Sequence, residues 1–154
     1  GNLREWQKTE DRKAFKERTE CIADEYSKFE AAPAMGDTPA QYLNGHLTLG
    51  ENTADNGGLR IAYMALVDTL AAEGKTINEE IDGYTAAQRY FLGFAQVWCQ
   101  NTKDAAARQA ALVDPHSPGK WRVNGSVRNF DEFGKAFGCT QGKPMYPVNS
   151  CRVW

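Results

Sequence analysis

The sequence lacks several features that would assign it to a common class of protein. It contains no uninterrupted apolar run of the roughly 20 residues that a helix needs to cross a bilayer, and no secretory signal opens it. It also lacks an excess of either charge, because its formal net charge at pH 7 is only -2. A basic surface for nucleic acid or for an anionic membrane is therefore not expected, and no nucleic-acid partner is predicted.

Residues that bind metals are also scarce. The chain has two histidines, which do not stand at HxxxH spacing, and its four cysteines form no CxxC pair. A catalytic zinc site normally needs three protein ligands, mostly histidine or cysteine. A complete zinc site cannot be assembled from this sequence, so the missing ligands of any such site must come from elsewhere.

What the chain does have is enough material for a folded core. Its 154 residues are 42% hydrophobic and 11% aromatic, which excludes global disorder, and a domain of this length buries roughly 70% of its unfolded surface. Four cysteines are more than a cytosolic domain of this size needs, so they indicate either disulfides formed in an oxidising compartment or buried free thiols. Spacing alone does not choose among the possible pairings.

Apolar spacing and helix-stop residues predict an all-α fold, with no persuasive strand. The predicted helices cover residues 3–29, 48–72, 85–99, 104–113 and 130–137, and the tail at 140–154 is expected to be extended. Thr85 and Gln88 form a capping-box pattern at one helix start. Asn129 and Glu132 form a similar pair at another. The helix at 85–99 is apolar almost all round and is interpreted as core, although the remaining segments hardly suffice to bury it on every side.

Two carboxylates lie on an apolar helix face. Glu51 and Asp55 continue the apolar stripe of the helix predicted at 48–72, so both are expected to point toward the core. A buried carboxylate needs a cation, a metal or hydrogen-bond donors. Alternatively, both lie in an exposed first turn, where acidic residues interact favourably with the helix dipole. Gly57 and Gly58 favour the first interpretation, because glycines are costly inside a helix and often mark the close approach of a backbone or a ligand.

A second polar segment runs from residue 114 to residue 122 and is predicted to be a stiff loop, because it contains Pro115 and Pro118. It presents His116 and Arg122. The imidazole could donate a hydrogen bond to a developing oxyanion, and the guanidinium could bind a peptide carbonyl or carboxylate. The alternative is that His116 is bonded to a neighbour in its own loop and that Arg122 is a surface or structural cation.

Four segments together resemble the neprilysin family of zinc metallopeptidases. The sequence TLGENTADNGGL at residues 48–59 is similar to the family's GENxADNGG segment, with Thr53 where the family usually has isoleucine. The segments at 94–99 and 114–122 and the C-terminal CRVW at 151–154 then follow in the family's order and spacing. The resemblance covers nearly all of the chain. It implies that residues 1–154 are the C-terminal part of the catalytic domain.

The resemblance implies a fold and a role for each site residue. The fold is the C-terminal helical portion of a thermolysin-like catalytic lobe, which is not a self-sufficient domain. The family's HExxH helix, with two histidine ligands and the glutamate general base, lies upstream of this chain. Glu51 corresponds to the third zinc ligand and Asp55 to the carboxylate that orients a zinc-bound histidine. His116 corresponds to the group that stabilises the oxyanion, and Arg122 to the one that binds the substrate backbone.

The resemblance also implies an activity, partners and a location. The expected activity is that of a Zn²⁺-dependent endopeptidase for peptides of modest size, with this fragment inactive alone. The alternative is a non-catalytic peptide-binding or structural module that has lost its metal. The expected partners are peptide substrates and the upstream part of the polypeptide, in an extracellular, periplasmic or membrane-anchored ectodomain whose anchor lies outside this chain. The family pattern pairs Cys21 with Cys151, and Cys99 and Cys139 with upstream cysteines.

Overall fold

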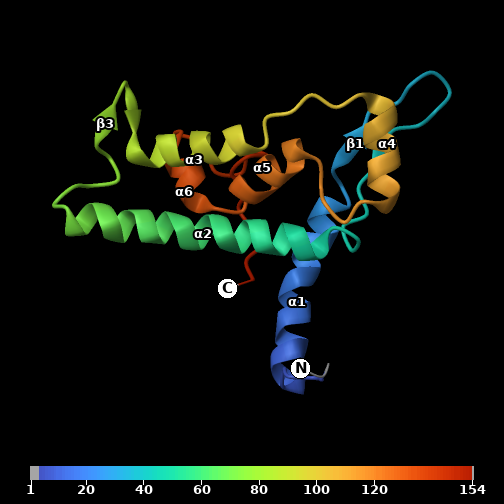
Figure 1. Ribbon diagram of the computed structural model, residues 1–154, viewed down its shortest axis with the longest axis horizontal. Helices are drawn as coiled ribbons and strands as arrows, with labels where there is room; N and C mark the ends of the chain where they lie inside the picture. Colours follow the sequence, from blue (N-terminus) through green and yellow to red (C-terminus); the bar gives the residue numbers. More distant parts are fainter. Residues whose placement is uncertain (1–3, 154) are drawn as a thin grey trace.

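A long helix, α2, runs along the molecule, and most of the other helices lie beside it (Figure 1). Residues 4–153, which the computed structural model describes, form six helices: α1 (Thr9–Tyr26), α2 (Leu49–Ala72), α3 (Ala86–Val97), α4 (Asp104–Val113), α5 (Gly119–Val127) and α6 (Asp131–Ala136). Helices α3, α5 and α6 lie along one side of α2, while α1 leaves from near its N-terminal end. The predicted all-α class is confirmed.

Two short hairpins correct the expectation that no strand would form. Both are antiparallel pairs: β1 (Glu30–Ala32) with β2 (Gln41–Tyr42), and β3 (Glu80–Ile81) with β4 (Tyr84–Thr85). Strands this short cannot show the alternation of apolar and polar residues by which a strand is recognised in a sequence. The second hairpin turns through Asp82 and Gly83, whose φ angles of 54° and 79° suit a tight hairpin turn.

Several predicted helix ends are confirmed by their local geometry. The side chain of Thr85 accepts from the Gln88 backbone N–H at 3.1 Å, and the Gln88 side chain accepts from the Thr85 N–H at 3.0 Å. This is the predicted capping box at the start of α3. Gly74, just after α2, and Gly138, just after α6, have φ angles of 72° and 62°, as expected for glycines that end helices.

Two other expectations about helix ends are wrong. The first helix begins at Thr9 rather than at residue 3, and Leu3 lies outside the described residues. The cap of α6 is Phe130, which makes no side-chain cap bond. Asn129 instead donates to Glu25 Oε2 at 2.5 Å and accepts from the Cys151 backbone N–H at 2.8 Å. Tertiary partners thus replace the local cap that the sequence pattern predicts.

The helix α5 was not expected, since residues 114–122 are predicted as a loop throughout. The loop ends at Pro118, which is the N-cap of α5, so that Arg122 lies on a helix. Gly119 and Gly125 lower the intrinsic helix propensity of this segment, but its packing against α2 compensates. Gly125 also has a packing reason, because a Cβ atom there would lie 2.4 Å from the hydroxyl oxygen of Tyr26.

The described residues pack into two apolar clusters. One contains Ile22, Tyr26, Phe29, Leu43, Ala111, Cys151 and Val153. The other contains Leu59, Tyr63, Ala87, Phe91, Val127 and Phe130.

The Cys21–Cys151 disulfide that the resemblance implies is present, with its Cα atoms 5.6 Å apart, and it ties the C-terminal segment to α1. Cys99 and Cys139 are free thiols in this structure, so their pairing with upstream cysteines stays a prediction.

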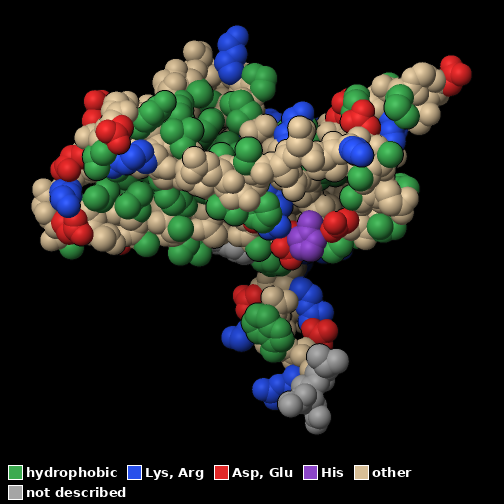
Figure 2. All heavy atoms as spheres, turned by 45° about the horizontal axis from the view of Figure 1, so that its top comes forward, with side chains coloured by type: hydrophobic (Ala, Val, Ile, Leu, Met, Phe, Trp, Pro, Cys, Tyr) green, Lys and Arg blue, Asp and Glu red, His purple; other side chains and the backbone are tan. Residues whose placement is uncertain are grey.

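A large part of the apolar surface is left open. As expected from the few segments available to surround it, α3 is buried on only part of its surface in the described residues: Phe91 is 2% exposed, but Leu92 is 40% and Val97 is 72% exposed. Figure 2 shows hydrophobic side chains gathered over the end of the molecule where α2 and α3 lie. The rest of residues 4–153 covers one face of α3 and leaves its other face exposed. Within residues 4–153, no helix is both long and apolar enough to cross a membrane.

Candidate metal and substrate site

Glu51 and Asp55 lie one turn apart near the start of α2, but their surroundings differ. The Asp55 side chain is 10% exposed, whereas that of Glu51 is 42% exposed and lies in the first turn of the helix. The two interpretations of these carboxylates therefore each hold for one residue. Asp55 is buried with a cation, and Glu51 is partly open to solvent.

Arg122 is the cation that neutralises Asp55. From α5 it donates through Nε to Asp55 Oδ2 at 2.6 Å and through Nη2 to Asp55 Oδ1 at 2.7 Å, a bidentate pair. Nη2 also approaches Glu51 Oε2 at 3.4 Å. The hydrogen bonds to Asp55 raise the pKa of Arg122 above its ordinary value. Of the two alternatives expected for Arg122, a surface cation is excluded, because the side chain is only 12% exposed, whereas the ion pair with Asp55 agrees with a structural cation.

Trp98 fixes the other side of the same guanidinium. The Arg122 Cζ lies 3.8 Å from the centre of the indole ring, within the range of a cation–π contact. Sequence reasoning interpreted the run that ends at Trp98 as core and so missed this role. Trp98 lies directly after α3 and Arg122 lies on α5, with all of α4 between them in the chain, so no local signal indicated the contact. The guanidinium is held between a carboxylate and an aromatic face.

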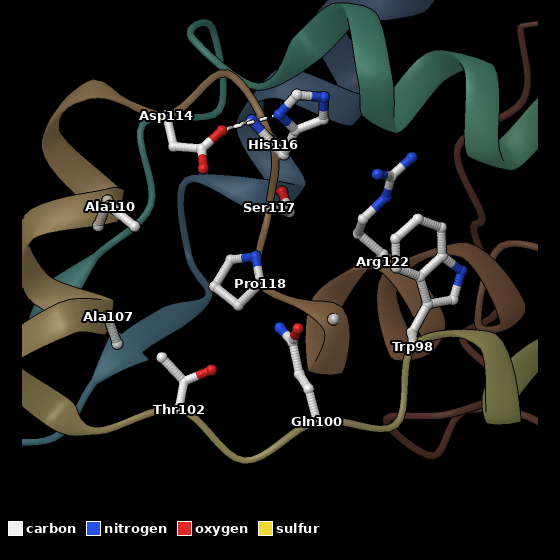
Figure 3. A pocket seen from close by; sticks show the side chains of 12 residues that line it. Trp98, Gln100, Thr102, Ala107, Ala110, Asp114, His116, Ser117, Pro118 and Arg122 are labelled. Atoms are coloured by element: carbon white, nitrogen blue, oxygen red, sulfur yellow. Dashed lines mark hydrogen bonds and ion pairs between the residues drawn. The ribbon is translucent and has the colours of Figure 1, made fainter.

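His116 lies at the rim of the cluster, on the loop before α5 (Figure 3). Its Nδ1 and its backbone N–H both contact Asp114 Oδ1, at 2.8 and 2.9 Å. The backbone hydrogen bond, followed by the side-chain one, lowers the pKa of Asp114. The Nε2 atom is then left facing Glu51, whose Oε2 lies 3.6 Å away. Asp114 was not identified from sequence as a functional residue, although an aspartate two positions before a loop residue is a common turn partner.

A cavity of about 270 Å³ lies beside these groups (Figure 3). His116 and Arg122 contribute polar walls, and Trp98, Ala107 and Ala110 contribute apolar ones. A mostly apolar hollow with a few converging polar groups is the usual form of a ligand site. The cavity therefore brings together two of the residues that the sequence analysis selected, while Glu51 and Asp55 lie directly behind Arg122.

The donor set fits one ligand of a zinc site. No group of three or more His, Cys, Asp or Glu residues within residues 4–153 is arranged to hold a metal. Glu51 is nevertheless suitable as a single ligand, because its carboxylate is accessible and because Arg122 makes its short bidentate contact with Asp55 instead. A carboxylate oxygen is an ordinary zinc ligand at about 2.0–2.2 Å. The remaining ligands would have to come from residues outside this chain.

The chain belongs to peptidase family M13, whose family model matches residues 1–153. The resemblance to the neprilysin family is thereby confirmed.

Relatives of known name agree with this assignment. The chain is 42% identical to endothelin-converting enzyme 1 of Mus musculus over 154 residues and 40% identical to membrane metallo-endopeptidase-like 1 of the same species over 156 residues. Both alignments cover all of this chain. The chain spans only about a fifth of those relatives, 19% and 20% of their lengths.

A solved structure shows the same fold. The zinc metalloprotease Zmp1 of Mycobacterium tuberculosis, in an open state, superposes with a TM-score of 0.88 at 35% identity. The match covers 100% of this chain and 24% of that one. The helical arrangement described here therefore matches one segment of that solved metalloprotease.

Proposed function

We propose that the chain is the C-terminal part of the catalytic domain of a zinc-dependent endopeptidase that hydrolyses peptides of modest size. One observation carries this proposal. The Arg122–Asp55 pair and the His116–Asp114 pair converge on the accessible carboxylate of Glu51. A site of this kind can hold a metal and can bind a peptide group beside it.

In this proposal Glu51 is the third protein ligand of the zinc ion. When bound, zinc supplies a Lewis acid that lowers the pKa of water and polarises the scissile carbonyl. The rigid helix under Glu51 holds the carboxylate at the edge of the cluster. Asp55, one turn further along, orients a histidine ligand that belongs to the upstream HExxH segment, as carboxylates do for metal-bound histidines.

Arg122 and His116 act on the substrate. Arg122 uses Nε and Nη2 for Asp55 and Nη2 also for Glu51, and in this proposal its Nη1 donates to a substrate carbonyl. The His116 ring is held at Nδ1 by Asp114, which turns Nε2 toward Glu51. From there Nε2 stabilises the oxyanion that forms when water attacks the peptide carbonyl.

The general base and the other ligands belong to the upstream part of the same polypeptide, which we also propose as the partner that covers the open apolar faces of α2 and α3. This chain alone is expected to be inactive. The Cys21–Cys151 disulfide supports a location outside the cytosol, because such bonds persist in oxidising compartments. Any membrane attachment would come from an anchor outside this chain.

The test uses the complete enzyme with its zinc bound and compares Glu51→Gln with wild type. The variant is expected to lose zinc on dialysis and to lose roughly 100-fold or more in kcat/KM for a fluorogenic peptide. Glu73→Gln is the matched control, because Glu73 lies just after the far end of α2 in an exposed ion pair with Lys75. It should keep both zinc and activity.

Two results would reject the proposal. One is a Glu51→Gln enzyme with full zinc content and full activity, which would remove Glu51 from the site. The other is a complete wild-type protein that binds no zinc and cleaves no peptide, which would favour the non-catalytic module.

A further inference from the structure

The residues that follow Glu51 and His116 in the chain are buried, polar and bonded to each other. Asn52 is 0% exposed and Ser117 is 4% exposed. Ser117 Oγ donates to Asn52 Oδ1 at 2.8 Å, which joins positions 65 residues apart. A buried bond thus connects α2 to the loop one residue away from each group of the proposed site.

Asn52 is itself held at its other end. Its Nδ2 donates to Thr48 Oγ1 at 2.8 Å, and that hydroxyl in turn donates to the Asn44 backbone oxygen at 3.2 Å. The Asn52 backbone oxygen accepts from Asn56 Nδ2 at 2.8 Å. Buried polar networks that are fully bonded are rigid, since any rotation would leave a group unsatisfied. The amide therefore presents a fixed acceptor to Ser117.

His116 has weaker restraints of its own. Its contact with Asp114 lies within the same loop, and its contact with Glu51 joins side chains that are 48% and 42% exposed. Exposed charge pairs contribute little to the position of a side chain. The buried Ser117–Asn52 bond is the restraint that acts between the loop and α2 away from solvent.

We propose that Ser117 and Asn52 are positioning residues that set the distance between His116 and Glu51 during peptide hydrolysis. This inference rests on the proposed function. Asn52 is fully buried, and Ser117, which borders the cavity, donates its hydroxyl hydrogen to Asn52, so both act through their neighbours and not on the reacting atoms. A displacement of a reacting group by about 1 Å costs up to about 100-fold in rate. Loss of the bond should therefore change turnover much more than substrate binding or zinc content.

The experiment measures Ser117→Ala, His116→Ala and the double variant in the complete, zinc-loaded enzyme. Ser117→Ala is expected to lower kcat by about 10- to 100-fold, with KM changed by less than about threefold and with unchanged zinc content. In the His116→Ala background the same change should lower kcat by less than about twofold, because Ser117 acts through His116. Ser126→Ala is the matched control: Ser126 is also buried, at 1% exposed, and its hydroxyl lies 3.4 Å from that of Tyr26 on α1.

Each result has a defined meaning. Wild-type kcat in Ser117→Ala, or losses that multiply in the double variant, would overturn the positioning role while an impaired His116→Ala enzyme keeps the proposed function. A fully active His116→Ala enzyme would instead reject the role of His116 and the inference with it. If Ser117→Ala does not fold, Ser117→Thr is compared with Ser117→Val instead. Threonine and valine have nearly the same shape, but only threonine has a hydroxyl group. Higher kcat in the Thr variant supports the inference, and equal kcat overturns it.

Discussion

The two halves of α2 differ in which side chains they bury and which they expose. In residues 49–58 the buried positions include Asn52 and Thr53, at 0% and 5% exposed. In residues 59–72 the exposed positions include Ile61 and Met64, at 62% and 59%. Folded proteins usually bury apolar side chains and expose polar ones. Each half of this helix therefore departs from the usual arrangement, and in the opposite direction.

The difference separates two tasks of one helix. The buried polar groups of residues 49–58 bind partners on the loop and on α5, as Asp55 does with Arg122 and Asn52 with Ser117. They form the frame of the proposed site. The exposed apolar groups of residues 59–72 have no such role within residues 4–153. Apolar patches of this kind mark interaction surfaces, which agrees with the proposed cover by the upstream polypeptide.

The largest effect is expected from removing the His116 side chain, which lies beside residues 49–58 of α2. His116→Ala in the complete enzyme should lower kcat by roughly 100- to 1,000-fold, as loss of one oxyanion donor does in other hydrolases. Zinc content should not change, because Glu51 remains in place. The measurement is steady-state hydrolysis of a fluorogenic peptide together with metal analysis.

His46→Ala is the control for that prediction. His46 is 65% exposed and its Nε2 lies 3.4 Å from Glu20 Oε1; it is not among the residues that line the cavity. It should leave turnover unchanged. If the two histidine variants have the same activity, the polar half of α2 frames no catalytic group.

The sequence predicted the helices better than the contacts between them. The apolar periodicity and Gly74 predicted α2, and the Thr85 capping box predicted the start of α3. Both signals come from residues close together in the sequence, so they can be recognised without knowing the tertiary contacts. The helix α5 was missed because its glycines oppose helix formation and only packing against α2 and Tyr26 compensates for them. Local signals are therefore reliable where no distant partner overrides them.

The sequence selected Glu51, Asp55, His116 and Arg122 by their positions and by family resemblance, and the structure brings these four side chains together, while their roles stay predictions. The contacts among them were not predictable. The bidentate contact of Arg122 with Asp55 joins positions 67 residues apart, so no spacing rule contains it. The stacking of Trp98 on Arg122 was missed for the same reason, and Asn52 and Ser117 look in sequence like ordinary polar residues.

A medium effect is expected where the apolar half is tested. If the upstream polypeptide covers this face as proposed, Met64→Ala in the complete enzyme should lower the free energy of unfolding by about 2–4 kcal/mol, the usual loss for a buried methionine. Met35→Ala is a close control, since Met35 is 57% exposed in this chain against 59% for Met64 but lies on the projecting loop between β1 and β2. It should change stability by less than about 0.5 kcal/mol. Chemical denaturation of both variants makes the comparison, and equal small effects would mean that the apolar half is not covered.

The smallest effect is expected at Thr53, a buried polar residue in the 49–58 half of α2. Thr53 Oγ1 has no hydrogen-bond partner within residues 4–153, at the position where the neprilysin-family pattern usually has isoleucine. Thr53→Val keeps the shape and removes the unsatisfied hydroxyl, so the complete enzyme should gain about 1 kcal/mol in the free energy of unfolding.

Thr69→Val in the same helix is the control for Thr53→Val, because the Thr69 hydroxyl is exposed and donates to the Ala65 backbone oxygen at 2.8 Å. It should change stability by less than about 0.5 kcal/mol. Denaturant unfolding of the metal-free enzyme measures both without a contribution from zinc. A loss of stability in Thr53→Val would mean that a group outside this chain bonds the hydroxyl. In that case every buried polar side chain of residues 49–58 would serve a contact, and the contrast with the apolar half would be complete.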